Sequence, residues 1–256
     1  MENIEIPFLE YEDNLNSFGT NNDNMYSNGE FVIAQKFIKR NNIVFDIGAN
    51  HGNWTKMVLS IAPLKMIYCV EPIQDLCKYL TTQFHFRNDL KIAWGAISDK
   101  LDNVDFYIYK NNPQIAEMSN MFGRPEIEIK MGLDIEKIKV KTLTIDHLCK
   151  NEKINKVNYI KIDTEGAELL ALKGSIETLK RNMIDFIQFE YGGCFKDSKA
   201  TLKETFQLLG SYNFTIFRIL PNGLMHFNYW KDEMENYLHS NYLAIHNCDL
   251  PITKIN

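Results

Sequence analysis

The stretch from Ile43 to Trp54 constrains the fold most, because it has the pattern of a buried strand, a glycine turn and the start of a helix. Ile43 to Phe45 is a short apolar run with β-branched residues, which predicts a strand. Asp46 ends this strand, and Gly48 and Gly52 punctuate the turn that follows. An open α/β sheet forms its ligand crevice from such units, at the carboxyl ends of its strands. The stretch therefore predicts a nucleotide-type pocket in an α/β fold.

The spacing of this turn indicates which nucleotide is bound. A dinucleotide fingerprint is G-x-G-x-x-G, whereas this turn is G-x-N-x-G, with Asn50 at its middle and no third glycine. Met66 to Val70 predicts the next strand, and Glu71 follows it, where a carboxylate binds ribose hydroxyls. Asp46 is placed to hold an ammonium group. S-adenosylmethionine carries both an amine and a ribose, so it fits this turn better than NAD does.

Three motifs, taken in their order along the chain, resemble the FkbM-type S-adenosylmethionine-dependent O-methyltransferases. They are FDIGANHG, then VEP, then YIKIDTEGAELLALKG from Tyr159 to Gly174, and the resemblance covers roughly Gly29 to Tyr191. It implies a class I methyltransferase-like fold: a Rossmann-like, mostly parallel α/β sheet with helices on both faces and an antiparallel strand near the C-terminus. With this fold, the expected cofactor-binding residues are Asp46, Gly48, Asn50, Gly52, Asn53, Glu71, Pro72, Ala96, Ser98 and Asp163.

Two later strands are also expected to end in carboxylates. Val157 to Ile162 precedes Asp163, and Ile184 to Phe189 precedes Glu190. A sugar hydroxyl is a poor nucleophile at neutral pH, so it needs a base within hydrogen-bond reach or a metal that lowers its pKa. We therefore expect Asp163 and Glu190, together with Glu165, to activate the acceptor hydroxyl.

The same carboxylates suggest a metal, because oxygen ligands suit Mg²⁺, Mn²⁺ or Ca²⁺ rather than zinc. A possible set of ligands is Asp163, Glu190 and His226. The alternative is that the carboxylates act without a metal, as a base or as plain hydrogen-bond acceptors.

Thr164 is expected to cap the helix that follows Asp163, with Leu179 on the apolar face of that helix.

The length of 256 residues suits one α/β domain with an insertion. Residues 1–28 are expected to form an N-terminal arm or a lid, and residues 29–256 the methyltransferase domain. Within that domain, residues 111–135 have no clear period, which predicts a substrate-side loop. Aromatic residues in 221–240 suit stacking on a sugar or cover for the sheet edge.

Composition excludes several classes of protein and partner. A net charge of −5 argues against nucleic-acid binding, which normally needs a basic surface. Five scattered cysteines and no signal-peptide pattern predict a reduced, cytoplasmic protein. No apolar run approaches the roughly 18–20 residues that span a bilayer. A homodimer is compatible with the sequence, which does not decide the oligomeric state.

The expected activity is transfer of a methyl group from S-adenosylmethionine to a sugar hydroxyl. The resemblance implies the substrate class, and within it we favour a nucleotide-activated sugar, such as a GDP-heptose, for capsular or other surface polysaccharide. Two alternatives remain: a nucleotide-sugar binding module without catalysis, and an NAD-dependent sugar oxidoreductase. The carboxylates Asp163 and Glu190 count against the first, and the missing third glycine counts against the second.

Overall fold

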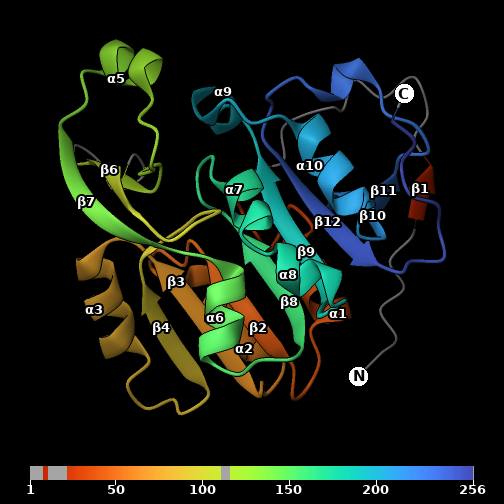
Figure 1. Cartoon of the computed structure of the whole chain (residues 1–256), viewed down its shortest axis with the longest axis horizontal. Helices are drawn as coiled ribbons and strands as arrows, with labels where there is room; N and C mark the ends of the chain where they lie inside the picture. Colours follow the sequence, from red (N-terminus) through yellow and green to blue (C-terminus); the bar gives the residue numbers. More distant parts are fainter. Residues whose placement is uncertain (1–7, 11–21, 111–115, 256) are drawn as a thin grey trace.

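A computed structural model of the chain describes residues 8–10, 22–110 and 116–255. Among these residues, nine strands form a large sheet and three more form a small one (Figure 1). The large sheet contains, in spatial order, β1 (Phe8–Glu10), β11 (Gly223–His226), β10 (Phe214–Leu220), β12 (Ser240–His246), β9 (Ile184–Tyr191), β8 (Val157–Ile162), β2 (Ile43–Ile47), β3 (Met66–Glu71) and β4 (Leu90–Trp94).

The half of the sheet from β9 to β4 is parallel throughout, whereas β12 lies antiparallel between β9 and β10. This arrangement confirms the predicted α/β class with an antiparallel strand near the C-terminus. Ile47 pairs with Ile162, which in turn pairs with Phe189. The residues that follow β2, β8 and β9 therefore emerge side by side at one edge of the sheet.

The strand order reverses direction beside β2. From β2 the chain proceeds outward to β3 and β4, and it later returns to add β8 on the other side of β2. In open α/β sheets, a ligand crevice lies at such a reversal, outside the carboxyl ends of the strands. The topology therefore places the expected pocket between the loops that follow β2 and β8.

Helices cover both faces of the sheet, as Figure 1 shows. Val44 and Ile67 pack with one set of helices, while Phe45 and Ile160 pack with the other, because neighbouring strand residues point to opposite faces. The first set is α1 (Glu30–Phe37), α2 (Asn53–Ile61) and α3 (Gln74–Gln83); the second is α6 (Ile145–Asn151), α7 (Glu168–Lys173), α8 (Ile176–Lys180) and α10 (Leu202–Gly210).

The helix after β8 differs from the sequence prediction. Thr164 does not cap it: α7 begins at Glu168, whose side-chain carboxylate accepts hydrogen bonds from the backbone N–H and hydroxyl of Thr164 and from the N–H of Gly166. The helix then ends at Lys173, with Gly174 as its C-cap, so Leu179 lies on the separate helix α8. Glu168 thus organises the turn between the strand and the helix, and the turn extends over residues 163–167.

The small sheet projects from the large one (Figure 1) and contains β5 (Ala96–Ile97), β7 (Ile135–Leu143) and β6 (Asn103–Tyr109), in that order. Between β6 and β7 lies the segment predicted to be irregular. It contains the helix α5 (Pro125–Met131), with proline at the start and Gly132 at the end. Part of this prediction, residues 111–115, falls outside the described residues.

The two remaining sequence predictions concern the chain ends. Most of the expected N-terminal arm falls outside the described residues, although β1 pairs with β11 at the sheet edge. In the aromatic stretch 221–240, which also contains the short helix η1 (Asp232–Met234), Trp230 packs against Phe206 with ring centres 5.6 Å apart. This packing indicates that Trp230 covers the sheet, whereas Tyr229 is exposed.

Among the described helices, none combines the length and apolarity that crossing a bilayer requires.

Candidate functional site

A cavity of about 760 Å³ opens at the carboxyl ends of β2, β3, β8 and β9, where the topology predicts it. Its size suits a cofactor together with part of an acceptor. The lining includes most of the residues expected from the sequence: Asp46, Gly48, Asn50, Asn53, Glu71, Pro72, Ala96, Asp163, Glu165 and Glu190.

The glycine turn lies tightly against the loop after β8. Gly48 has a φ of 85°, and a Cβ atom there would stand 1.7 Å from the carbonyl oxygen of Asp163. Only glycine fits this approach. Asn50, at the middle of the turn, also has positive φ and donates its backbone N–H to Glu71 at 2.9 Å. The turn is therefore fixed to the ends of both neighbouring strands.

Glu71 is buried at the end of β3 and faces the cavity. One carboxylate oxygen accepts the N–H of Asn50, and the other accepts the N–H of Ile73 at 2.8 Å. Burial raises the pKa of Glu71 to about 7, against the effect of these hydrogen bonds. Carboxylate oxygens have further lone pairs, so Glu71 can still accept hydrogen bonds from ribose hydroxyls.

Asp46 lines the cavity from β2, and its carboxylate accepts a hydrogen bond of 2.5 Å from the hydroxyl of Thr55. Burial raises the pKa of Asp46, while nearby Lys161 opposes the rise. Beside it, two buried polar atoms, Oδ1 of Asn50 and Nε1 of Trp54, have no hydrogen-bond partner among the described residues. Buried polar groups are normally paired, so these atoms fit a site that a polar cofactor completes.

Of two neighbouring residues expected to bind the cofactor, Ala96 and Ser98, the structure brings one to the cavity. Ala96 lines the cavity, but Ser98 does not; its hydroxyl donates to Asp99 at 3.2 Å. Apolar side chains of the cavity lining come from three places. Ile73 and Leu76 lie at the start of α3, Ile97 and Phe106 belong to the small sheet, and Met121 belongs to the segment between β6 and β7.

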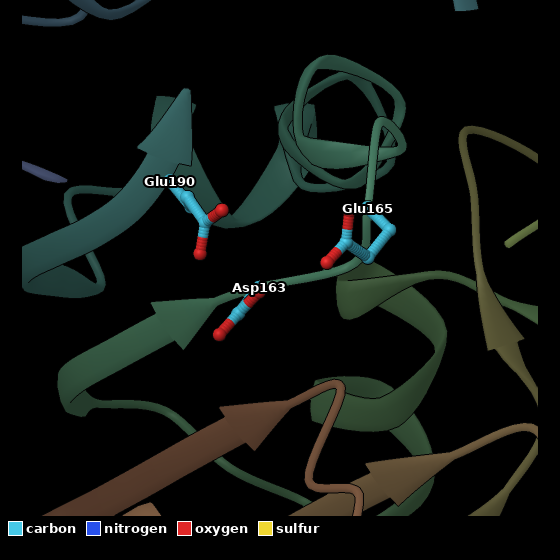
Figure 2. Close-up of side chains that lie close together, drawn as sticks. All are labelled: Asp163, Glu165 and Glu190. Carbon is cyan, nitrogen blue, oxygen red and sulfur yellow. The ribbon is translucent and has the colours of Figure 1, made fainter. Parts of the chain in front are cut away.

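Three carboxylates, those of Asp163, Glu165 and Glu190, meet in the cavity (Figure 2), with oxygens that all lie within 4.8 Å of one another. Asp163 follows β8 and Glu190 lies near the end of β9, as predicted. Glu165 comes from the turn before α7, where its φ of 52° is uncommon for a residue with a side chain. We refer to these three residues as the carboxylate cluster.

Each member of the carboxylate cluster faces a different cation of the protein. Nζ of Lys161 lies 2.5 Å from Asp163, Nη1 of Arg124 lies 3.4 Å from Glu165, and Nε2 of His239 lies 3.4 Å from Glu190. The sequence interpretation did not identify these three cations. Lys161 had a local signal, since it is a charge inside an apolar strand two residues before Asp163. Arg124 and His239 had none, because loops distant in sequence bring them here.

These pairs set the ionisation of the cluster. Burial opposes the charge on Asp163, but Lys161 outweighs it and holds the pKa of Asp163 below its ordinary value. Burial and the charge of Asp163 raise the pKa of Glu190 to about 7. The Glu190 carboxylate, 3.4 Å from Nε2 of His239, raises the pKa of His239 to about 9. Burial and the neighbouring Glu190 raise the pKa of Glu165. Asp163 is therefore the member of the cluster that stays ionised, and so carries no proton, near neutral pH.

We expect the ligand-free protein to lose stability as pH rises from about 5 to about 8. Burial raises the pKa of Glu71 to about 7 and that of Glu168 to about 8, so in this range the folded state binds protons that the unfolded state has released. Their stabilising contribution is complete below about pH 4.5 and disappears as pH rises through the folded-state values. Thermal unfolding followed between pH 5.5 and pH 8 measures the effect. Glu168→Gln should make the dependence shallower, and a melting temperature that rises with pH would contradict the prediction.

His226 does not belong to this site. It lies on β11, which β10 and β12 separate from β9, and its Nε2 is 2.8 Å from the carbonyl oxygen of Pro251. The sequence prediction of His226 beside Asp163 and Glu190 was therefore wrong about the histidine. The histidine at Glu190 is His239, which directly precedes β12.

Comparison with known proteins identifies the family. The family model described as the methyltransferase FkbM domain matches residues 46–216. A curated relative, the 2-O-methyltransferase NoeI of Sinorhizobium fredii, is 24% identical over 188 residues, which are 71% of this chain and 76% of NoeI.

Two solved structures resemble this one. Methyltransferase FkbM from Methylobacillus flagellatus KT has a TM-score of 0.51 at 14% identity, and the match covers 80% of this chain and 44% of that chain. Aeropyrum pernix fibrillarin in complex with S-adenosyl-L-methionine has a TM-score of 0.43 at 12% identity, covering 81% and 67%.

The family model spans the glycine turn, Glu71 and the whole carboxylate cluster, so the match includes most of the cavity lining. This match also argues against the alternative of an NAD-dependent oxidoreductase. The chain belongs to the FkbM methyltransferase domain family and is an S-adenosylmethionine-dependent methyltransferase.

Proposed function

We propose that this protein transfers a methyl group from S-adenosylmethionine to a hydroxyl of a sugar. The carboxylate cluster carries this proposal, because three carboxylates around one space can accept hydrogen bonds from neighbouring hydroxyls of one ring. The name of NoeI, a 2-O-methyltransferase, supports oxygen as the acceptor atom.

When bound, S-adenosylmethionine supplies an electrophilic methyl group on its sulfonium. The protein has to align the acceptor oxygen with that methyl group and exclude water. As the carbon–oxygen bond forms and the carbon–sulfur bond breaks, the hydroxyl proton passes to a carboxylate. Asp163 is suited to receive it, since Lys161 keeps Asp163 ionised. Glu190 and Glu165 can hold the neighbouring hydroxyls as hydrogen-bond acceptors.

A nucleotide-activated sugar, such as a GDP-heptose for capsular or other surface polysaccharide, is the narrower hypothesis. Its diphosphate should lie at the mouth of the cavity and not beside Asp163. The two permanent cations in the described lining, Arg124 and Lys161, already face carboxylates. Eight acidic side chains share the lining with them: Asp23, Glu30, Asp46, Glu71, Glu117, Asp163, Glu165 and Glu190.

The direct test is incubation with labelled S-adenosylmethionine and a panel of acceptors. The panel should pair each nucleotide sugar with the matching simple glycoside, so that the contribution of the nucleotide is measured separately. Label transferred to a sugar hydroxyl supports the proposal, and preference for the nucleotide form supports the narrower hypothesis. A protein that binds S-adenosylhomocysteine but labels no sugar would favour the alternative of a binding module without catalysis.

A divalent cation remains a hypothesis for this site. Hard oxygen ligands from Asp163, Glu165 and Glu190 suit Mg²⁺, Mn²⁺ or Ca²⁺ in type and spacing. A cation held there would lower the pKa of the acceptor hydroxyl. The same three carboxylates already face Lys161, Arg124 and His239, which compensate their charge without a metal.

A chelator experiment distinguishes a cluster that binds a divalent cation from one that acts without a metal. If a metal activates the acceptor, methyl transfer should be lost in EDTA and restored by Mg²⁺, Mn²⁺ or Ca²⁺, while S-adenosylhomocysteine binding persists. Full activity after exhaustive EDTA treatment would remove the metal from the proposal and leave Asp163 as a base that acts without one. Labelled-methyl transfer and calorimetry on the same treated sample measure both quantities.

A further inference from the structure

Arg124 joins three segments of the chain that are distant in sequence. It comes from the segment of residues 116–134 between β6 and β7, which we call the cap segment. Its Nη1 lies 3.4 Å from Glu165, and its Nε lies 3.2 Å from Asp197. Glu165 stands in the turn before α7, and Asp197 belongs to α9 (Cys194–Ser198). Only 11% of the Arg124 side chain is exposed, so both ion pairs are shielded from water.

The backbones around Arg124 are closely packed as well. A Cβ atom on Gly193 would stand 3.3 Å from Nη2 of Arg124. A Cβ atom on Gly166 would stand 2.8 Å from the carbonyl oxygen of Cys194 and 3.4 Å from the ring of Phe122. The cap segment, the turn before α7 and the start of α9 therefore pack directly against one another. Arg124 is the charged contact at their junction.

Glu165 needs such a contact to keep its position. Its backbone has a φ of 52°, a conformation that costs energy for a residue with a side chain. Its carboxylate also faces Asp163 and Glu190, whose negative charges repel it. The guanidinium of Arg124 is the cation that attracts it toward the cavity. Without Arg124, both the backbone strain and the repulsion favour a turn that points Glu165 away from the cluster.

We propose that Arg124 is a positioning residue that holds Glu165 in the acceptor site, so that docking of the cap segment completes the carboxylate cluster. This inference rests on the proposed function, because it assigns the cluster to the acceptor. Arg124 does not itself contact the reacting atoms in this arrangement. The cap segment contributes residues 116–119, Met121 and Arg124 to the cavity lining. The contact of Arg124 with Glu165 therefore joins the cap segment and the turn before α7 in one site.

An arginine suits this position better than a lysine. The planar guanidinium presents several N–H donors in a fixed fork and can face two carboxylates at once, whereas an ammonium is a single point of charge on a flexible stem. Arg124→Lys should therefore keep the attraction to one carboxylate and lose the bridge to the other. If Arg124 bridges two carboxylates, the activity of Arg124→Lys should lie between that of the unmodified protein and that of Arg124→Leu.

The test compares Arg124→Leu and Arg124→Lys with Lys130→Gln, a control that removes an exposed charge from α5 in the same cap segment. Using the best acceptor of the sugar panel, Arg124→Leu should lower kcat and raise the acceptor KM, each by about tenfold or more, because a displacement of about 1 Å at a reacting centre can cost about a hundredfold. Arg124→Lys should recover part of the loss. S-adenosylhomocysteine affinity should stay within about twofold in all three variants.

A double-mutant cycle with Glu165→Gln then shows whether Arg124 acts through Glu165. If it does, Arg124→Leu should add less than about twofold to the loss already caused by Glu165→Gln. Fully additive losses would mean that Arg124 binds the acceptor directly, and they would overturn the proposal. Unchanged kinetics in Arg124→Leu, or a parallel collapse of cofactor affinity, would overturn it as well.

Hydrogen exchange tests the docking without any acceptor. Arg124→Leu should speed amide exchange in the cap segment and in residues 163–168, and Lys130→Gln should not. Unaltered exchange at residues 163–168 would overturn the coupling between the cap and the turn. If no sugar is methylated by the unmodified protein, the proposed function fails, and this measurement still decides whether Arg124 holds the turn.

Discussion

Asp163→Asn is expected to lower kcat for methyl transfer by about 10²- to 10⁴-fold, the usual contribution of a positioned proton acceptor. Asp163 follows β8 at the point where the sheet order reverses, and Lys161 at 2.5 Å keeps it ionised. The asparagine keeps the size of the side chain and loses the ability to take a proton. Asp163 is also an expected cofactor-binding residue, so calorimetry with S-adenosylhomocysteine has to accompany labelled-methyl transfer in order to measure the loss of chemistry separately from any loss of binding.

A matched control for this variant exists on the neighbouring strand. Asp185→Asn also removes a carboxylate that pairs with a lysine, Lys156, but at the opposite end of the sheet. It should leave kcat near that of the unmodified protein. Glu190→Gln should lower kcat as well, because Glu190 faces the same space as Asp163. Near-normal turnover in both Asp163→Asn and Glu190→Gln would mean that the catalytic centre lies elsewhere.

Glu71→Ala is expected to weaken S-adenosylhomocysteine binding by about tenfold to a hundredfold, as the loss of a charge-assisted hydrogen bond of about 1.5–3 kcal/mol implies. Glu71 is buried at the end of β3 and presents its carboxylate to the cavity. It also accepts the N–H groups of Asn50 and Ile73, so the alanine variant frees two backbone donors in the same turn. Calorimetry with S-adenosylhomocysteine measures the change.

Two controls distinguish cofactor binding from a general loss of structure. Asp75→Ala removes an exposed carboxylate on α3, outside the described lining of the cavity, and should not affect binding. Glu71→Gln keeps the side-chain volume and one carbonyl acceptor, so its loss of affinity should be smaller than that of alanine. A thermal unfolding curve for each variant shows whether the turn is intact. Unaltered affinity in Glu71→Ala would remove Glu71 from the cofactor site.

The parts of the fold that were predicted correctly are those that depend on residues close together in the sequence. The apolar run of β2, the glycine turn and the carboxylates at the ends of β3, β8 and β9 are all predicted by local patterns. Parallel strands then bring their carboxyl ends to one edge, so Asp163 and Glu190 meet without further information from the rest of the chain. The family resemblance and the fold class rest on the same local motifs.

Predictions failed where a local pattern competed with contacts made elsewhere. Thr164 has the right type and position for a helix cap, but the Glu168 side chain accepts its N–H and hydroxyl, and α7 begins four residues later. Ser98 was expected to bind the cofactor, yet it does not line the cavity, whereas Phe106 of the small sheet and Met121 of the cap segment do. In both cases, a partner close in space outweighs the preference of the single residue.

The sequence by itself determined the α/β class, the cofactor turn and the positions of Asp163 and Glu190, because periodicity and strand ends are local properties of the chain. Only the tertiary structure decided which cations face these carboxylates. Arg124 reaches Glu165 from the cap segment, 41 residues away, and His239 reaches Glu190 across the pairing of β9 with β12. Side chains so far apart in sequence meet only when the sheet order and loop packing bring them together, which is why a single sequence favoured His226 and the structure selects His239.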